Sequence, residues 1–138
     1  MRTRAMKVHA VAVITSALVT LSACAGEPEP DAAIVALPFE ELGSRKPRAE
    51  EIACVLEVAG TSLQRDRTTK LRHYARGGIR QYVLLSLADR SAEEYLDPAP
   101  SDGTYAPAIV HRGEATIRLF LDRTADETLA VELRDLFG

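Results

Sequence analysis

At 138 residues, 46% of them hydrophobic and 27% charged, the chain is long enough for one modest core and too apolar for wholesale disorder. Its formal net charge of -3 excludes a strongly basic protein that binds nucleic acid through overall charge. Two cysteines and three scattered histidines exclude a disulfide framework and a zinc finger.

The first 25 residues have the layout of a bacterial lipoprotein signal. A basic start, MRTRAMK, precedes Val8 to Ala23, a stretch without Asp, Glu, Lys or Arg that is too short for a comfortable membrane span. Leu21, Ser22 and Ala23 then lead to Cys24. Acylation of Cys24 would anchor the mature chain to a membrane.

The next part of the chain predicts two strands separated by a loop. Ala32 to Leu37 is a short apolar run after the proline-rich EPEP, which favours a strand. Glu40 to Arg48 contains Gly43 and Pro47 and predicts a loop. Ile52 to Ala59 is apolar except for Glu57, so we expect a buried central strand that carries one acid.

One helix and further strands follow. Gln64 to Arg76 predicts the main helix, with two glycines after its end. A strand is predicted at Tyr82 to Leu87, with a hairpin partner at Ala92 to Leu96. A second hairpin is predicted around Arg112-Gly113, with strands at Thr104 to His111 and Ala115 to Leu121. Leu129 to Phe137 predicts a terminal strand with a helical turn. The sequence therefore predicts an α/β fold, a mixed sheet with a flanking helix in a single small domain.

Three residues carry the candidate chemistry. Asp31 opens the first strand, Glu57 lies inside the second and Lys70 stands on the helix. Cleavage of a phosphodiester needs carboxylates that hold a divalent metal and a cation near the charge that develops on the phosphate. A buried ionised Glu57 costs several kcal/mol unless it is paired or bound to a metal.

Each of these residues also has a purely structural interpretation. Glu57 could pair with an Arg or Lys where the strand emerges, and Asp31 could be an ordinary turn acid. Lys70 could pair with Asp66 one helical turn earlier. By helical spacing Asp66, Lys70 and Tyr74 share one face, so the two neighbours would flank Lys70 in a site.

Six basic residues lie within sixteen positions on and after the predicted helix: Arg65, Arg67, Lys70, Arg72, Arg76 and Arg80. One interpretation is a basic helix that faces DNA. The other is an ordinary solvated helix face.

Several strings in compatible order resemble the Uma-two family, a branch of the PD-(D/E)XK nuclease superfamily. They are GEPEPDAAIV at 26–35, KPRAEEIACVLEVAGTSLQRDRTTKLRHYARGGIRQYVLLSL at 46–87, DGTY at 102–105 and ELRDLF at 132–137.

The resemblance implies a restriction-endonuclease-like nuclease domain at 26–138 that cleaves DNA. Asp31 and Glu57 would hold Mg²⁺ or Mn²⁺ with help from a backbone carbonyl beside Glu57. Lys70 would orient or deprotonate the attacking water and counter charge on the phosphate.

The chain also departs from the family pattern. Many superfamily members have a Lys two residues after the acid, where this chain has Ala59; the Uma-two pattern places it on the following helix, as at Lys70. Gly60 and Ser86 stand where the family has acids, and Arg80-Gln81-Tyr82-Val83 replaces Pro-Glu-Tyr-Trp. Family members are longer, and residues 9–21 resemble a shortened remnant of their N-terminal helix. A nuclease with a weakened or inactive site is therefore one alternative.

The second functional hypothesis is a non-catalytic lipoprotein. In it a small α/β binding domain is tethered to the bacterial envelope through Cys24, whereas the nuclease hypothesis implies a cytoplasmic protein with DNA as its partner. The sequence leaves the oligomeric state open.

Acylation of Cys24 is a testable prediction of the lipoprotein hypothesis. If the signal is used, Cys24→Ser abolishes acylation and releases the protein from membranes, because stable anchoring depends on the attached chains. Membrane partition and mass spectrometry of wild type and variant measure this. Unchanged membrane partition in the variant would contradict the hypothesis.

Overall fold

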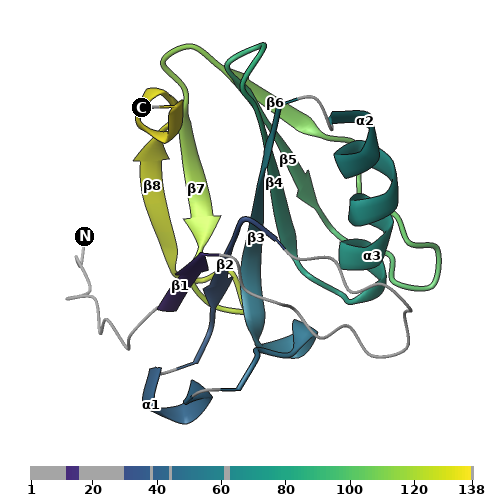
Figure 1. Ribbon diagram of the computed structural model, residues 1–138, viewed down its shortest axis with the longest axis vertical. Helices are drawn as coiled ribbons and strands as arrows, with labels where there is room; N and C mark the ends of the chain where they lie inside the picture. The colour runs from purple at the N-terminus through teal and green to yellow at the C-terminus, as the bar shows by residue number, and fades with distance from the viewer. Residues whose placement is uncertain (1–11, 16–29, 38, 44, 61–62, 138) are drawn as a thin grey trace.

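The computed structural model describes residues 12–15, 30–37, 39–43, 45–60 and 63–137. These residues form three layers (Figure 1). A mixed sheet lies in the middle, the helix of residues 63–76 covers one face, and a two-stranded sheet covers the other. The predicted α/β fold in a single small domain is confirmed.

The strands of the central sheet lie in the order in which they occur in the chain. They are β1 (Ala12–Thr15), β2 (Ala32–Val35), β3 (Ile52–Ala59), β4 (Gln81–Ser86), β5 (Ser91–Leu96) and β6 (Ile109–Arg112). β3 and β4 run parallel, and the other neighbours run antiparallel. A parallel pair needs a crossover connection, which the helix between β3 and β4 supplies.

β3 is buried on both faces, which explains its nearly continuous apolar sequence. Successive side chains of a strand point to opposite faces. Val55 packs in the cluster beneath the helix, and Leu56 packs in the cluster beneath the two-stranded sheet. Glu57 is next along the strand and therefore faces the helix.

The helix between β3 and β4 has three parts: α2 (Leu63–Arg65), a π-helical turn (Asp66–Lys70) and α3 (Leu71–Arg76). The predicted helix from Gln64 to Arg76 is thus confirmed, with a π turn inside it. Gly78, at φ +73°, has a backbone conformation that favours glycine after the helix end. Isolated π turns occur frequently at functional sites.

The second layer consists of β7 (Thr116–Phe120), β8 (Thr128–Glu132) and a 3-10 turn (Leu133–Phe137). Ile117, Leu119 and Leu133 from this layer pack against Val83 and Leu85 of β4. The terminal strand and helical turn that the sequence predicts over Leu129 to Phe137 are therefore confirmed.

Gln81 joins the two sheets through its buried side-chain amide. Its Nε2 donates to Glu94 Oε2 at 2.7 Å and to the Arg118 carbonyl of β7 at 2.8 Å. Its Oε1 accepts the Phe120 N–H at 2.8 Å. The amide thus satisfies two backbone groups of β7, which orients this strand over β4.

The second predicted hairpin is wrong. Arg112-Gly113 does form the start of a turn, with Gly113 at φ +64°, but the strands on its two sides enter different sheets. β6 pairs with β5, and β7 pairs with β8. The predicted loop from Glu40 to Arg48 also contains a short helix, α1 (Phe39–Leu42), and is followed by a 3-10 turn (Ala49–Glu51).

Part of the N-terminal segment belongs to the sheet. Ala12–Thr15 form β1, which pairs with β2, so a helical remnant is wrong for these four residues. Cys24 lies outside the residues that the structure describes. Within the described ranges, no helix is long and apolar enough to cross a membrane.

The Gln81 bridge makes a stability prediction. Gln81→Met removes the bonds to both sheets, including the buried bond to Glu94, and leaves the part-buried Phe120 N–H without its acceptor, which costs about 1–3 kcal/mol for each buried group left unsatisfied. Urea unfolding measures this loss. Arg118→Ala is the control, because its exposed side chain takes no part in the bridge, and a change within about 0.5 kcal/mol is expected. Equal losses in both variants would contradict the assigned role of the bridge.

Candidate active site

Glu57 is the centre of the candidate site. Its side chain is 1% exposed, and both carboxylate oxygens accept hydrogen bonds from the helix. Lys70 Nζ donates to Oε2 at 2.9 Å, and Tyr74 Oη donates to Oε1 at 2.8 Å. The buried acid therefore has the basic partner and the hydrogen bonds that an ionised carboxylate needs inside a protein.

Burial raises the pKa of Glu57, because removal from water disfavours the charged carboxylate. The hydrogen bonds from Lys70 and Tyr74 act in the opposite direction, and the negative charge of Asp31 adds to the increase. The net shift is upward. Glu57 is thus a carboxylate whose charge the fold tolerates at a cost.

Asp31 lies beside Glu57 at the start of β2. The antiparallel register pairs Ala32 with Leu56, and one further step along it brings Asp31 opposite Glu57. Asp31 Oδ2 accepts the Val58 N–H at 2.7 Å, so it is fixed to the residue that follows Glu57. The prediction that the strands bearing Asp31 and Glu57 are neighbours is confirmed.

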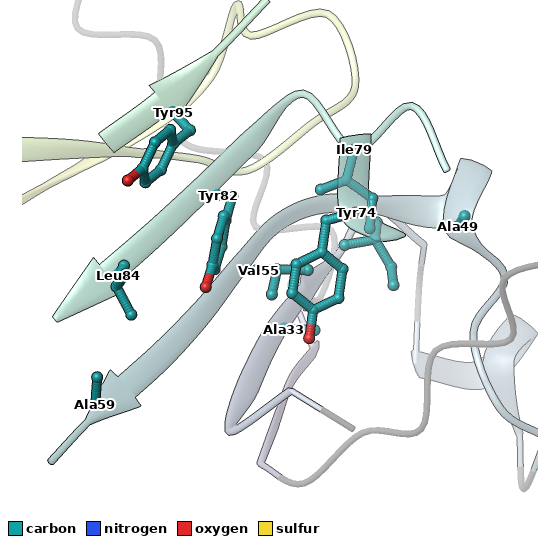
Figure 2. Close-up of a cluster of buried hydrophobic side chains, with 10 residues drawn as sticks. Ala33, Ala49, Val55, Ala59, Tyr74, Ile79, Tyr82, Leu84 and Tyr95 are labelled. Carbon is teal, nitrogen blue, oxygen red and sulfur yellow. The ribbon is translucent and has the colours of Figure 1, made fainter. Parts of the chain in front are cut away.

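The helix is held in place by aromatic packing beneath it. The Tyr74 and Tyr82 rings lie 5.1 Å apart between centroids, and the Tyr82 and Tyr95 rings stack at 5.5 Å. Figure 2 shows Tyr74 reaching from the helix into the cluster that Val55 and Tyr82 form on the sheet. This packing positions the Tyr74 hydroxyl for its bond to Glu57.

The structure brings the three predicted residues together from three elements. Lys70 stands at the end of the π turn, one helical turn before Tyr74, and both reach Glu57. The expectation that Lys70 and Tyr74 share a face is confirmed. The Asp66 side chain lies outside what the structure describes.

The oxygen ligands at this position fit a hard divalent cation. Asp31 and Glu57 supply two carboxylates, and Mg²⁺ is commonly bound by one or two carboxylates together with waters and substrate phosphates. Among the side chains that the structure describes, no group of three or more His, Cys, Asp or Glu could hold a metal ion by itself. Waters and substrate would complete the coordination.

A second buried carboxylate, which the sequence analysis did not identify, lies on the same face. Glu93 of β5 accepts three hydrogen bonds from the Arg67 guanidinium, the shortest at 2.6 Å. Tyr95 Oη donates to Glu93 Oε1, also at 2.6 Å. Burial disfavours the Glu93 charge, but the bonds from Arg67 and Tyr95 prevail and hold its pKa below the ordinary value. The sequence does contain a signal for this buried acid. Glu93 and Glu94 are adjacent in an otherwise apolar predicted strand, so one of them must face each side of the sheet.

The six basic residues around the helix lie in different environments. Lys70 and Arg67 turn to the sheet and pair with Glu57 and Glu93. Arg80 donates to the Arg123 carbonyl in the loop between β7 and β8. Arg72 and Arg76 pack with their side chains against Gly103 in the loop after β5. The contacts of these residues differ, and a basic helix that faces DNA stays a prediction.

Residues 3–132 match the sequence profile of the Uma2 family, described as "Putative restriction endonuclease". The chain belongs to this family. The match covers nearly the whole chain and includes most of the signal-like segment. No curated protein matches the sequence.

The fold is similar to that of a crystal structure described as a putative nuclease belonging to DUF820 from Anabaena variabilis ATCC 29413. The TM-score is 0.62 at 17% sequence identity, over 91% of this chain and 66% of that protein. At this identity the likeness shows the fold alone. The chain spans only 66% of the length of that protein.

Glu57 makes a prediction about stability and pH. Because its folded pKa is raised, its favourable contribution is present below the ordinary value of 4.5 and is lost as the pH rises through the folded pKa. We expect Glu57→Gln to gain stability relative to the wild type as the pH rises above this value. Urea unfolding at a series of pH values measures the difference.

Glu51→Gln is a matched control of opposite sign. The hydrogen bond from Arg45 lowers the pKa of Glu51, so its contribution is present above 4.5 and is lost as the pH falls through the folded pKa. Removal of this acid should therefore cost stability at neutral pH and little at low pH. A Glu57→Gln difference that is constant with pH would contradict the raised pKa.

Proposed function

We propose that this Uma2-family chain is a metal-dependent DNA endonuclease whose catalytic residues are Asp31, Glu57 and Lys70. The observation that carries the proposal is the buried Glu57 carboxylate. It accepts hydrogen bonds from Lys70 and Tyr74 of the helix and lies beside Asp31 on the neighbouring strand. A buried acid with an upward-shifted pKa and a basic partner is typical of functional sites. Family membership indicates the nuclease reaction.

Asp31 and Glu57 are the proposed ligands of Mg²⁺ or Mn²⁺. The cation, when bound, supplies a Lewis acid that polarises the phosphoryl oxygens. Asp31 uses Oδ2 for the Val58 N–H, which leaves Oδ1 without a hydrogen bond among the described residues. Tyr74 fixes the orientation of Glu57 through its bond to Oε1.

Lys70 is the proposed cation for the scissile phosphate. Its side chain is 26% exposed while Glu57 is almost fully buried, so the ammonium stands between the buried acid and solvent. Hydrolysis forms a bond from a water oxygen to phosphorus and breaks the bond to the leaving sugar oxygen; the attacking water loses a proton to solvent, and the leaving oxygen takes one from solvent. Lys70 would orient this water and offset the charge that develops on the phosphate.

The departures from the family pattern define the alternative to this function. Ala59 stands where many relatives of the superfamily carry the lysine, and Lys70 supplies an ammonium at Glu57 from the helix. Ser86, in the position of an expected acid, is buried and shares a long hydrogen bond of 3.5 Å with Asp89. An inactive relative of the nucleases would keep the fold and lack cleavage.

A second candidate function, a binding domain tethered through Cys24, rests on the signal-like sequence. The family match argues for the nuclease, because it begins at residue 3 and so includes residues that a processed signal would lose. The pairing of β1 with β2 argues in the same direction. A cytoplasmic protein that acts on DNA follows from the proposed function.

Cleavage of plasmid DNA tests the proposed function. We expect wild-type protein to nick or linearise plasmid with Mg²⁺ or Mn²⁺, and Asp31→Asn and Glu57→Gln to lower the rate by about 10²-fold or more. Asp31→Asn is the cleaner variant, because an amide oxygen can still accept the Val58 N–H. Lys70→Ala should also lose cleavage. It leaves a buried acid without its partner, so its stability must be measured beside its activity.

Glu51→Gln serves as the activity control, since Glu51 pairs with Arg45 in another part of the molecule. It should cleave at the wild-type rate. A thermal shift on addition of either metal, lost in Asp31→Asn, gives an independent measure of metal binding. Absence of cleavage and of any shift in the wild type would identify an inactive relative.

A further inference from the structure

The two buried acids on the helix side of the sheet lie in one row across three strands. Glu57 of β3 pairs in register with Leu84 of β4, and Leu84 pairs with Glu93 of β5. Neighbouring strands are about 4.8 Å apart, so the two acids stand about 10 Å apart along the row. Each acid accepts hydrogen bonds from one cationic side chain of the helix and from one tyrosine hydroxyl.

Arg67 has donors left over after it has paired with Glu93. Its Nε and Nη2 donate to the carboxylate, and the Tyr95 hydroxyl also interacts with the guanidinium. A guanidinium has five N–H groups in a planar fork that suits phosphate as well as carboxylate. The side chain is 39% exposed, so the remaining donors can reach a ligand from solvent.

Cations gather around this row. Arg67 and Lys70 come from the same helix, three residues apart, and Arg112 of β6 is close enough to help lower the pKa of Glu93. Asp89 in the turn after β4 is a further acid whose charge acts on Arg67. The row lies toward the carboxyl ends of the parallel strands β3 and β4.

We propose that Arg67, held by Glu93, is a positioning residue that binds a backbone phosphate next to the scissile phosphodiester. The inference rests on the proposed function, because Lys70 and Glu57 then mark the scissile position. The separation of about 10 Å along the row places Arg67 beyond the reacting phosphate and on the path of the same nucleic acid. Glu93 fixes the guanidinium in one orientation, so that little side-chain entropy is lost when a phosphate binds.

Substitution of Arg67 and substitution of Glu93 should have opposite effects on DNA binding. Arg67→Gln removes a phosphate contact, so the affinity for a short DNA duplex should fall about three- to tenfold. The slope of log affinity against log salt should become shallower by about one. Glu93→Gln removes a negative charge beside Arg67 but keeps an amide oxygen that can accept from the guanidinium and orient it, so affinity should be unchanged or higher. A purely structural ion pair would give the same effect from either side, since both variants break it.

The experiment measures binding of a fluorescent duplex without metal, between about 50 and 200 mM salt. Arg45→Gln is the matched control, because Arg45 also makes a two-pronged ion pair, with Glu51, and is 44% exposed. It should bind as the wild type does. Arg67→Lys keeps the charge and should recover most of the salt slope, although it loses the fork.

A cleavage measurement separates this inference from the proposed function. Arg67→Gln should raise KM more than it lowers kcat, because the phosphate contact is present before and during the reaction. If the wild type binds and cleaves DNA while Arg67→Gln matches Arg45→Gln, the inference is wrong and the proposed function stands. If Arg67→Gln weakens binding but no variant or wild type cleaves, the phosphate contact stands and the proposed catalysis is wrong. If the wild type neither binds the duplex nor cleaves DNA with either metal, both are wrong.

Discussion

The carboxylate of Glu57, buried in the middle of the most apolar strand, is the constraint on which the arrangement of the helix depends. An isolated charge there would cost several kcal/mol, so the fold must deliver a cation and a hydroxyl to the same point. Lys70 and Tyr74 do so from one face of the helix. This requirement fixes both the rotation of the helix and its height above the sheet, and the tyrosine cluster beneath it fills the remaining space.

Much of this structure could be predicted from local sequence patterns. The boundaries of β3 follow directly from the apolar run of Ile52 to Ala59, and the helix from its two terminal glycines. The convergence of Lys70 and Tyr74 follows from their spacing, because residues four apart share a helix face. Asp31 required more than pattern, since its place beside Glu57 depends on the β2–β3 register.

The elements that the sequence did not reveal are those decided by distant partners. β6 and β7 flank a glycine turn as hairpin strands do, and the pairing of β6 with β5 and the Gln81 bonds to β7 place them in different sheets. The Arg67–Glu93 pair was missed for the same reason. Its members are 26 residues apart and meet only through the register of three strands. Local periodicity contains no information about such contacts.

Glu57 and Glu93 also make the docking of the helix on the sheet depend on pH, and their two contributions have opposite signs. Local undocking of the helix would expose both carboxylates and return each to its ordinary pKa. Glu57, whose pKa is raised in the folded state, then favours undocking as the pH rises above 4.5. Glu93, whose pKa is lowered, favours undocking as the pH falls below the same value. These two groups therefore act on the docked helix in opposite directions as the pH changes, and amide hydrogen exchange along α3 would sense the balance between them.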